Sequence, residues 1–352
     1  MHEWTETIRT GGNLSADSVA GAVGWLVDEA VSAEDKADFL TAFAKKGETA
    51  QEITAFAKEL RSRSTLLPLP EGLFHTNELL DVCGTGGDRL NTFNISTTVG
   101  LLCAGAGVFV AKHGNRAVTS SSGSADVLEA LGIPINLSPA AAGLALQQHG
   151  FAFLFAPQFH PAFKGIGAAR KLCATRGQRT IFNFLGPLLN PARPTVQLVG
   201  VSQPDLTGPM ARALQSLGLH RAMVVSGAVA NAEGTVVFLD ELSTLGENTV
   251  AEFHQDRALC QSLWSPSSLP LTPAGLADLE GGDARENAAT VEGLFTGKIT
   301  GPKLDAVLLN SAAALFLAGR AGSITEGWAL ADEVIESGSA LRKLRELQGQ
   351  SC

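Results

Sequence analysis

Apolar residues in the first sixty positions of the chain recur at helical spacing, and no strand-like run interrupts them. Ile53 and Phe56 fall on one helical face, and Thr49 followed by Glu52 is the pattern of a capping box at a helix start. An apolar helical face needs a surface to pack against. The pattern therefore predicts either a small helical domain or a subunit interface. The proline-rich segment 66–72 cannot continue a helix, so we expect a linker there.

Beyond this linker, short apolar runs alternate with capped amphipathic segments. Such alternation is typical of an α/β fold with a mostly parallel central sheet, in which each helix connects two strands. The expected strands cover residues 79–83, 108–111, 151–156, 196–201, 222–225 and 236–239. The expected helices cover residues 124–131, 138–149, 205–217, 304–317 and 323–335.

Composition narrows the class of protein. The chain has 352 residues, of which 45% are hydrophobic and 17% are charged, and its net charge is −9. This acidic balance argues against broad binding to nucleic acid or to acidic membranes, because counterion release needs clustered positive charge. The five cysteines are scattered, the first residues do not resemble a signal peptide, and the longest apolar stretch, 99–111, is too short to cross a bilayer. We expect a cytoplasmic protein with no nucleic-acid or membrane partner.

Two polar clusters follow strand-like runs and together predict an anion site. Residues 84–88 read Gly-Thr-Gly-Gly-Asp, which leaves backbone N–H groups uncovered, and residues 112–116 read Lys-His-Gly-Asn-Arg, with serines at 120–122 and at 124, the expected N-cap of the next helix. Between them, residues 91–97 supply hydroxyl groups and a helix start. Ligands of α/β sheets bind beyond the carboxyl ends of strands, so these segments would face one crevice suited to a polyphosphate. Each cluster alone also fits an ordinary turn or cap.

Two adjacent carboxylates, Asp240 and Glu241, end the apolar run 236–239. Mg²⁺ typically takes one or two carboxylates, keeps several waters and bridges to substrate phosphates. An acidic dipeptide alone is also common on surface turns. Its interpretation as a magnesium site therefore depends on the phosphate site.

Ordered motifs lie at 84–88, 94–97, 112–132, 160–162 and 179–191. Together they resemble the anthranilate phosphoribosyltransferase family over nearly the whole chain. The resemblance implies a small all-helical domain plus a larger α/β domain with a mostly parallel sheet. The helical domain would be residues 1–70, completed by about 165–190, and the α/β domain would be 71–164 and 191–352. The resemblance also implies a homodimer, and it leaves open an association with anthranilate synthase.

Members of this family transfer the phosphoribosyl group of 5-phosphoribosyl diphosphate (PRPP) to the amine of anthranilate, in tryptophan biosynthesis. The amine is neutral near pH 7, so positioning and stabilisation of the departing pyrophosphate suffice, and we expect no covalent nucleophile. The positions that match PRPP-binding residues are Gly84, Gly87, Asp88, Thr92, Asn94, Ser96, Thr97, Lys112, Ser120 and Ser124. The positions that match Mg²⁺ ligands are Ser96, Asp240 and Glu241, and those that match anthranilate-binding residues are Gly84, His113, Asn115 and Arg170.

The chain departs from the family pattern in two segments. Residues 170–179 are a few residues longer than the pattern, so Arg176 competes with Arg170 as the partner of the anthranilate carboxylate. Residues 227–233 are also expanded, and the glycine and aspartate usual before the acidic pair are absent. Two other functions remain to be compared with the transferase: a nucleoside phosphorylase, which would use inorganic phosphate, and a non-catalytic relative that binds nucleic acid, which would need a basic surface.

Overall fold

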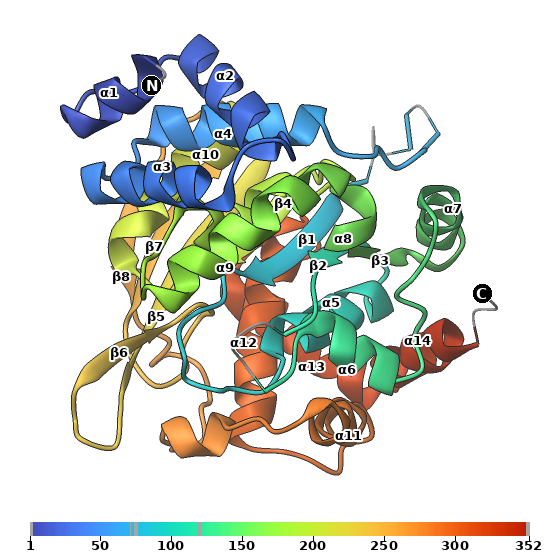
Figure 1. Ribbon diagram of the computed structural model, residues 1–352. Helices are drawn as coiled ribbons and strands as arrows, with labels where there is room; N and C mark the ends of the chain where they lie inside the picture. Colours follow the sequence, from blue (N-terminus) through green and yellow to red (C-terminus); the bar gives the residue numbers. More distant parts are fainter. Residues whose placement is uncertain (1–2, 71, 74–76, 118–120, 350–352) are drawn as a thin grey trace.

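The centre of the molecule is one sheet with helices on both faces (Figure 1). The structure is a computed structural model that describes residues 3–70, 72–73, 77–117 and 121–349. The strand order is β3-β2-β1-β4-β5-β7-β8, and β6 pairs with β5. The strands are β1 (Leu79–Gly84), β2 (Phe109–Gly114), β3 (Phe151–Phe155), β4 (Val196–Gly200), β5 (Arg221–Ala230), β6 (Val236–Leu239), β7 (Asn248–His254) and β8 (Cys260–Trp264).

The strands from β3 to β5 are parallel, as the alternating pattern predicts. Strand β1 pairs parallel with β2 and β4, β2 with β3, and β4 with β5. Strands β6, β7 and β8 extend the sheet antiparallel from β5. The register sets Gly84 at the end of β1 beside Gly200 at the end of β4. The carboxyl ends of the parallel strands therefore lie along one edge, and the expected mostly parallel α/β architecture is confirmed.

The sheet is apolar on both faces. Neighbouring residues on one strand belong to different cores: Val82 packs in the core beneath α12 (Pro302–Leu317), whereas Cys83 packs in the core shared with the N-terminal helices. Burial on both faces explains the near-continuous apolar runs of the parallel strands. The helices beyond the N-terminal four are α5 (Ile95–Gly105), α6 (Ser124–Ala130), α7 (Pro139–His149), α8 (Ala156–Phe159), α9 (Gly167–Thr175), α10 (Thr207–Ser216), α11 (Ala284–Phe295), α12 (Pro302–Leu317), α13 (Ile324–Glu336) and α14 (Ser339–Gln348).

The first four helices gather at one end of the molecule, at the top of Figure 1. They are α1 (Glu3–Arg9), α2 (Ala16–Val27), α3 (Ala33–Lys46) and α4 (Ala50–Ser62). The predicted capping box of Thr49 and Glu52 opens α4. Helix α9 from the middle of the chain packs against α3, and Ile166, Ala169 and Cys173 share the apolar core of the first four helices. The division into domains stays a prediction, and these contacts are consistent with it.

The predicted strands and helices lie close to their predicted ranges, although β5 continues to Ala230 and the largely buried α11 was not predicted. Strands β7 and β8 were not predicted; β8 lacks an apolar pattern because every one of its residues except Trp264 is exposed. Ser124 is not the N-cap of α6: Gly123 holds that position, and its N–H donates to Asp126 Oδ2 at 2.9 Å. The Ser124 hydroxyl instead donates to the carbonyl of Asn115 at 3.3 Å. Among the described residues, no helix is both long and apolar enough to cross a membrane.

Candidate active site

The glycine-rich loop leaves the end of β1 and wraps around the Asp240 carboxylate. The N–H of Gly86 donates to Asp240 Oδ2 at 2.6 Å. Gly86 and Gly87 both have positive φ, 73° and 83°, which glycine adopts without steric cost. Gly84 is needed for a different reason, since a side chain there would overlap the Asp240 carboxylate. The glycines of the Gly-Thr-Gly-Gly pattern therefore allow the end of β1 to lie in contact with the acidic pair.

The second carboxylate of the pair is held by the start of α5. Glu241 Oε1 accepts from the N–H of Ser96 at 3.2 Å, and the Glu241 side chain is largely buried. Burial raises the pKa of Asp240 to about 7, with a further contribution from the Asp88 carboxylate, and burial with Asp240 nearby raises the pKa of Glu241 to about 8. Carboxylates whose ionised forms are disfavoured in this way gain most from a cation.

The acidic pair fits Mg²⁺ better than a metal that needs a protein cage. No group of three or more His, Cys, Asp or Glu side chains among the described residues is arranged to hold a metal ion. Mg²⁺ does not require such a group, because it is usually bound by one or two carboxylates together with water and substrate phosphates. Ser96, whose N–H donates to Glu241 Oε1, also carries a hydroxyl group that would be a further oxygen ligand for such an ion.

Gly200 lets the chain of the acidic pair cross the end of β4. A Cβ at this position would overlap the carbonyl group of Asp240. We expect Gly200→Ala to displace Asp240 and to lower thermal stability by about 1–3 kcal/mol, the usual cost of overpacking a buried site. Differential scanning calorimetry and activity together check this, with Gly186→Ala as the control because a Cβ there meets no atom within 4 Å. Equal Tm values for the two variants would show that the crossing tolerates a side chain.

Lys112 lies inside the site, behind the acidic pair. Lys112 is 1% exposed, and its Nζ donates to the carbonyl of Val82 at 2.6 Å and to the Ser96 hydroxyl at 3.3 Å. The ammonium group thus joins β1, β2 and α5 at their site ends. Its charge also lowers the pKa of Glu241, against the larger effect of burial. The predicted lysine is therefore a fixed buried charge rather than a mobile surface group.

Asn94 and Ser122 are joined by Asn287, a residue that the sequence patterns did not single out. Asn287 lies on α11, is 2% exposed, and donates from Nδ2 to Asn94 Oδ1 at 2.9 Å and to Ser122 Oγ at 2.7 Å. Ser122 Oγ in turn donates to Asn94 Oδ1 at 3.0 Å. This amide bridge fixes the serine-rich turn relative to α5.

The other residues predicted to bind PRPP occupy the same edge of the sheet, where the structure describes them. Asp88 Oδ1 accepts from the N–H of Leu90 at 3.2 Å, and Thr92 forms an isolated bridge with Glu280. Thr97 is buried on α5, with 1% exposure. Ser124 occupies the first turn of α6. Ser120 lies outside the described residues.

A buried polar network beneath the site was also missed from the sequence. Asp81 is fully buried on β1 and accepts from Asn190 Nδ2 at 2.9 Å and from Gln197 Nε2 at 3.0 Å. On the opposite side of the acidic pair, Asn310 of α12 pairs with both backbone groups of Leu242, at 2.9 and 3.0 Å. These side chains secure the strand end and the acidic loop that the site residues occupy.

The two arginines that compete for the acceptor carboxylate differ in their surroundings. Arg176 already pairs with Asp38 of α3, at 3.0 Å. Arg170 forms no ion pair with the described residues, and its guanidinium lies 5.6 Å from the ring centre of Phe182. Both residues are exposed. The free charge of Arg170 therefore favours it as the partner of an incoming carboxylate.

A chain of rings runs from His113 to Arg170. The His113 and His160 Nε2 atoms are 3.1 Å apart, so when both rings are neutral one nitrogen carries the proton and the other accepts it. His160 stacks on Phe163, with ring centres 5.2 Å apart, and Phe163 meets the Phe182 ring edge-on at 5.8 Å. His113 and Arg170, two residues predicted to hold anthranilate, are thus connected through packed aromatic side chains. Asn115, the third, is exposed after β2, and its Oδ1 accepts from the N–H of Arg116 at 2.8 Å.

The histidine pair should make the protein sensitive to acid. Burial and the neighbouring His160 lower the pKa of His113 to about 3, and burial lowers the pKa of His160 to about 4. An unfolded histidine titrates near 6.5, so the unfolded state binds more protons below that pH. The contribution of the two neutral histidines to the free energy of unfolding is complete above about pH 6.5. It is lost as the pH falls towards 4 for His160 and towards 3 for His113. At pH 5 each histidine should cost at most about 2 kcal/mol of unfolding free energy.

Urea unfolding at pH 7.5 and pH 5 checks this prediction. The free energy of unfolding should fall less between pH 7.5 and pH 5 in His160→Asn than in the unsubstituted protein, whatever the substitution costs at pH 7.5. His254, which is exposed, provides the matched control as His254→Asn. An unchanged difference in His160→Asn would mean that His160 does not contribute to acid sensitivity.

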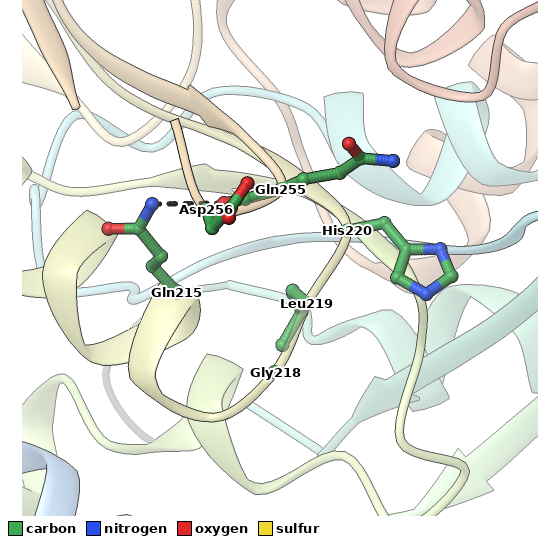
Figure 2. Close-up of a pocket in the computed structure, with 6 residues that line it drawn as sticks. All are labelled: Gln215, Gly218, Leu219, His220, Gln255 and Asp256. Atoms are coloured by element: carbon green, nitrogen blue, oxygen red, sulfur yellow. Dashed lines mark hydrogen bonds between the residues drawn. The ribbon is translucent and has the colours of Figure 1, made fainter. Parts of the chain in front are cut away.

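A surface hollow of about 440 Å³ lies at the opposite edge of the sheet and is not part of this site (Figure 2). Its lining residues are Gln215, Gly218, Leu219, His220, Gln255 and Asp256. Gln215 lies at the end of α10, residues 218–220 form the turn that enters β5, and Gln255 and Asp256 follow the end of the antiparallel β7, where Arg221 pairs with His254. In Figure 2 the Gln215 amide reaches across the hollow, and it donates to the carbonyl of Gln255 at 3.0 Å. The Gln215 amide is therefore bonded to the backbone of the hollow itself, with a second bond to the carbonyl of Arg257 at 2.9 Å.

Comparison with known proteins places the chain in a family. Residues 76–341 match the α/β-domain model of a glycosyl transferase family, and residues 2–64 match the helical-bundle-domain model of a glycosyl transferase family. The fold and the glycine-rich site thus define an enzyme of the glycosyl transferase class. The chain belongs to the anthranilate phosphoribosyltransferase family. The resemblance of its motifs to that family is confirmed.

Three similar proteins illustrate the match. The anthranilate phosphoribosyltransferase of Petrotoga mobilis is 43% identical over 344 residues, which is 98% of this chain and 95% of the relative. The crystal structure of the Thermus thermophilus enzyme has a TM-score of 0.86 and 39% identity, and the match covers 99% of this chain and 98% of that one. The Saccharomyces cerevisiae enzyme in complex with PRPP and Mg has a TM-score of 0.84 and 28% identity, covering 98% and 95%.

Proposed function

We propose that this protein transfers the phosphoribosyl group of PRPP to the amine of anthranilate and releases pyrophosphate, in tryptophan biosynthesis. The observation that carries this assignment is the glycine-rich loop wrapped around Asp240, with Glu241 bound to the start of α5. This arrangement brings backbone N–H groups, two carboxylates and the buried charge of Lys112 to one strand edge. It suits a magnesium-bound diphosphate. The yeast relative bound to PRPP and Mg supports the choice of ligand and cofactor.

One set of residues would bind PRPP and Mg²⁺. PRPP would contact Gly84, Gly87, Asp88, Thr92, Asn94, Ser96, Thr97, Lys112, Ser120 and Ser124. Ser96, Asp240 and Glu241 would hold Mg²⁺, which neutralises the charge of the diphosphate when it is bound. Lys112, fixed by the carbonyl of Val82, supplies a positive charge behind the departing pyrophosphate without having to reorganise.

Anthranilate would be oriented by Gly84, His113, Asn115 and Arg170. Its carboxylate would pair with the free guanidinium of Arg170, and its ring would lie near the aromatic side chains between His113 and Arg170. The neutral amine then attacks C1 of the ribose as the C1–O bond breaks, so the protein contributes orientation and no covalent nucleophile. The low pKa of His113 makes it a neutral hydrogen-bonding group at pH 7.

The loss of anthranilate fluorescence tests this proposal. The purified protein is mixed with anthranilate, PRPP and Mg²⁺, with controls that lack PRPP or the metal, and with a known active enzyme alongside. A loss that requires both additions supports the transferase. No loss would exclude it, and phosphorolysis of a nucleoside without Mg²⁺ would then indicate a nucleoside phosphorylase.

The assembly and location of the protein also belong to this proposal. We expect a homodimer and an enzyme of the cytoplasm, and association with anthranilate synthase is a further expectation. Light scattering of the purified protein measures the first. Co-purification with the synthase from the same cells measures the last.

A further inference from the structure

The cations of the proposed PRPP site are not equally available to a ligand. The chain has three arginine or lysine residues between positions 79 and 124: Arg89, Lys112 and Arg116. Lys112 is buried and bonded to Val82 and Ser96. Arg116 is paired with two acids of α6, with Nη1 at 2.8 Å from both Asp126 and Glu129. Arg116 cannot reach a ligand without losing these partners, and Lys112 can meet one only from its fixed position, with the single N–H donor that Val82 and Ser96 leave unused.

Arg89 differs from both. It is exposed, and within the described part of the chain its side chain forms no hydrogen bond and no ion pair. Its φ is 60°, a left-handed conformation that residues with a Cβ adopt rarely and at an energetic cost. A long cationic side chain at such a position, in a loop otherwise rich in glycine, is unfavourable for the backbone.

The loop that carries Arg89 is fixed on both sides. On one side, the N–H of Gly86 is bonded to Asp240. On the other, Asn91 Oδ1 accepts from the Ser121 hydroxyl at 2.7 Å, and the carbonyl of Asn91 accepts from the N–H of Gly281. Residue 89 therefore lies between the part of the loop held by the acidic pair and the part held by the serine-rich turn. The fixed ends hold the backbone of residue 89 at the rim of the proposed diphosphate site, within reach of a long exposed side chain.

We propose that Arg89 is a further ligand of the diphosphate group of PRPP and of the pyrophosphate product. This inference rests on the proposed function and deepens it. The acids Asp88, Asp240 and Glu241 crowd one side of the site, and the diphosphate adds more negative charge. A guanidinium offers two parallel N–H donors to a phosphate, which a buried lysine cannot do. Arg89 is the one arginine or lysine of segment 79–124 that is free in the described structure to do so.

Arg89→Gly tests the proposal without straining the fold. Glycine accepts φ near 60° readily, so the Tm should stay the same or rise. We expect the KM for PRPP to increase about tenfold, as for the loss of one partly exposed charged hydrogen bond, and the KM for anthranilate to stay the same. The dissociation constant of pyrophosphate, measured by calorimetry in the presence of Mg²⁺, should also increase about tenfold. Arg89→Lys should recover part of both losses.

Two control variants separate charge from backbone effects. Arg257→Ala removes an exposed cation whose carbonyl accepts from the Gln215 amide, and Gln255→Gly relieves another left-handed residue, with φ of 57°, in the hollow of Figure 2. Neither should alter the binding of pyrophosphate. Unchanged binding in Arg89→Gly, or an increase confined to the KM for anthranilate, would overturn the role of Arg89. Calorimetry needs no turnover. A protein that binds pyrophosphate but does not consume anthranilate would therefore contradict the proposed function, while the effect of Arg89→Gly on pyrophosphate binding would still test the role of Arg89.

Discussion

The double variant Asp240→Asn/Glu241→Gln should lose about two to three orders of magnitude in kcat/KM for PRPP and most of its dependence on Mg²⁺. The two carboxylates lie at the strand edge that the glycine-rich loop encloses, where Asp240 is bonded to Gly86 and Glu241 to Ser96. An amide keeps the shape and the accepting oxygen but not the charge that binds a hard cation. Electrostatic groups in such sites typically contribute factors of this size. Steady-state rates across a Mg²⁺ titration measure the effect.

The same substitution should leave the fold intact. The ionised carboxylates are disfavoured by burial and by each other, so amides at these positions should not lower the Tm of the metal-free protein. Glu233→Gln is the matched control, because Glu233 is an exposed acid on the turn between β5 and β6, at the other end of β6 from the acidic pair. If the metal dependence of the double variant equals that of the control, the acidic pair does not bind Mg²⁺.

Arg170→Ala should raise the KM for anthranilate about 10- to 100-fold and change the KM for PRPP little. Its guanidinium is unpaired among the described residues, so the substitution removes a charged contact to the substrate and breaks no ion pair of the protein. Arg176→Ala is the closest control. Arg176 is also an exposed arginine, but it caps the end of α9 and pairs with Asp38. Steady-state kinetics with each substrate varied in turn distinguish the two.

Three outcomes of this comparison are informative. A selective effect of Arg170→Ala supports its role as the carboxylate partner. A selective effect of Arg176→Ala would assign that role to Arg176 and would mean that the pair with Asp38 opens when substrate binds. Equal rises in the KM values for both substrates in Arg170→Ala would indicate a structural role for its packing on Phe182.

The glycine-rich loop, Lys112 and the acidic pair could be predicted together from the sequence, because each follows an apolar strand and parallel strands end at one edge. Asn287 and Asn310 could not. They occupy ordinary helical positions, and their partners Asn94 and Leu242 are 193 and 68 residues away in the chain. An isolated asparagine within a helix has no local pattern that reveals such a distant partner.

Local rules also failed where two polar groups compete for the same task. Ser124 is a good N-cap by type, yet Asp126 accepts from the N–H groups of both Gly123 and Ala117 and so sets the start of α6 one residue earlier. In the same way, Arg170 and Arg176 could not be ranked by sequence. Their difference comes from Asp38, which lies 138 residues from Arg176 in the chain and is brought to it by the packing of α3 on α9.

The contact between Gly86 and Asp240 spans 154 residues of the chain. Synthesis proceeds from the N-terminus, so the glycine-rich loop leaves the ribosome long before the carboxylates that it encloses. The helical N-terminal segment and β1 to β3 can begin to fold in that interval, but the half of the site that would carry the metal cannot yet exist. We therefore expect the nascent protein to acquire affinity for magnesium-bound diphosphate late, after β6 has been made. A ligand of this site would accordingly stabilise the nearly finished chain and would not stabilise folding intermediates that form before β6 has been made.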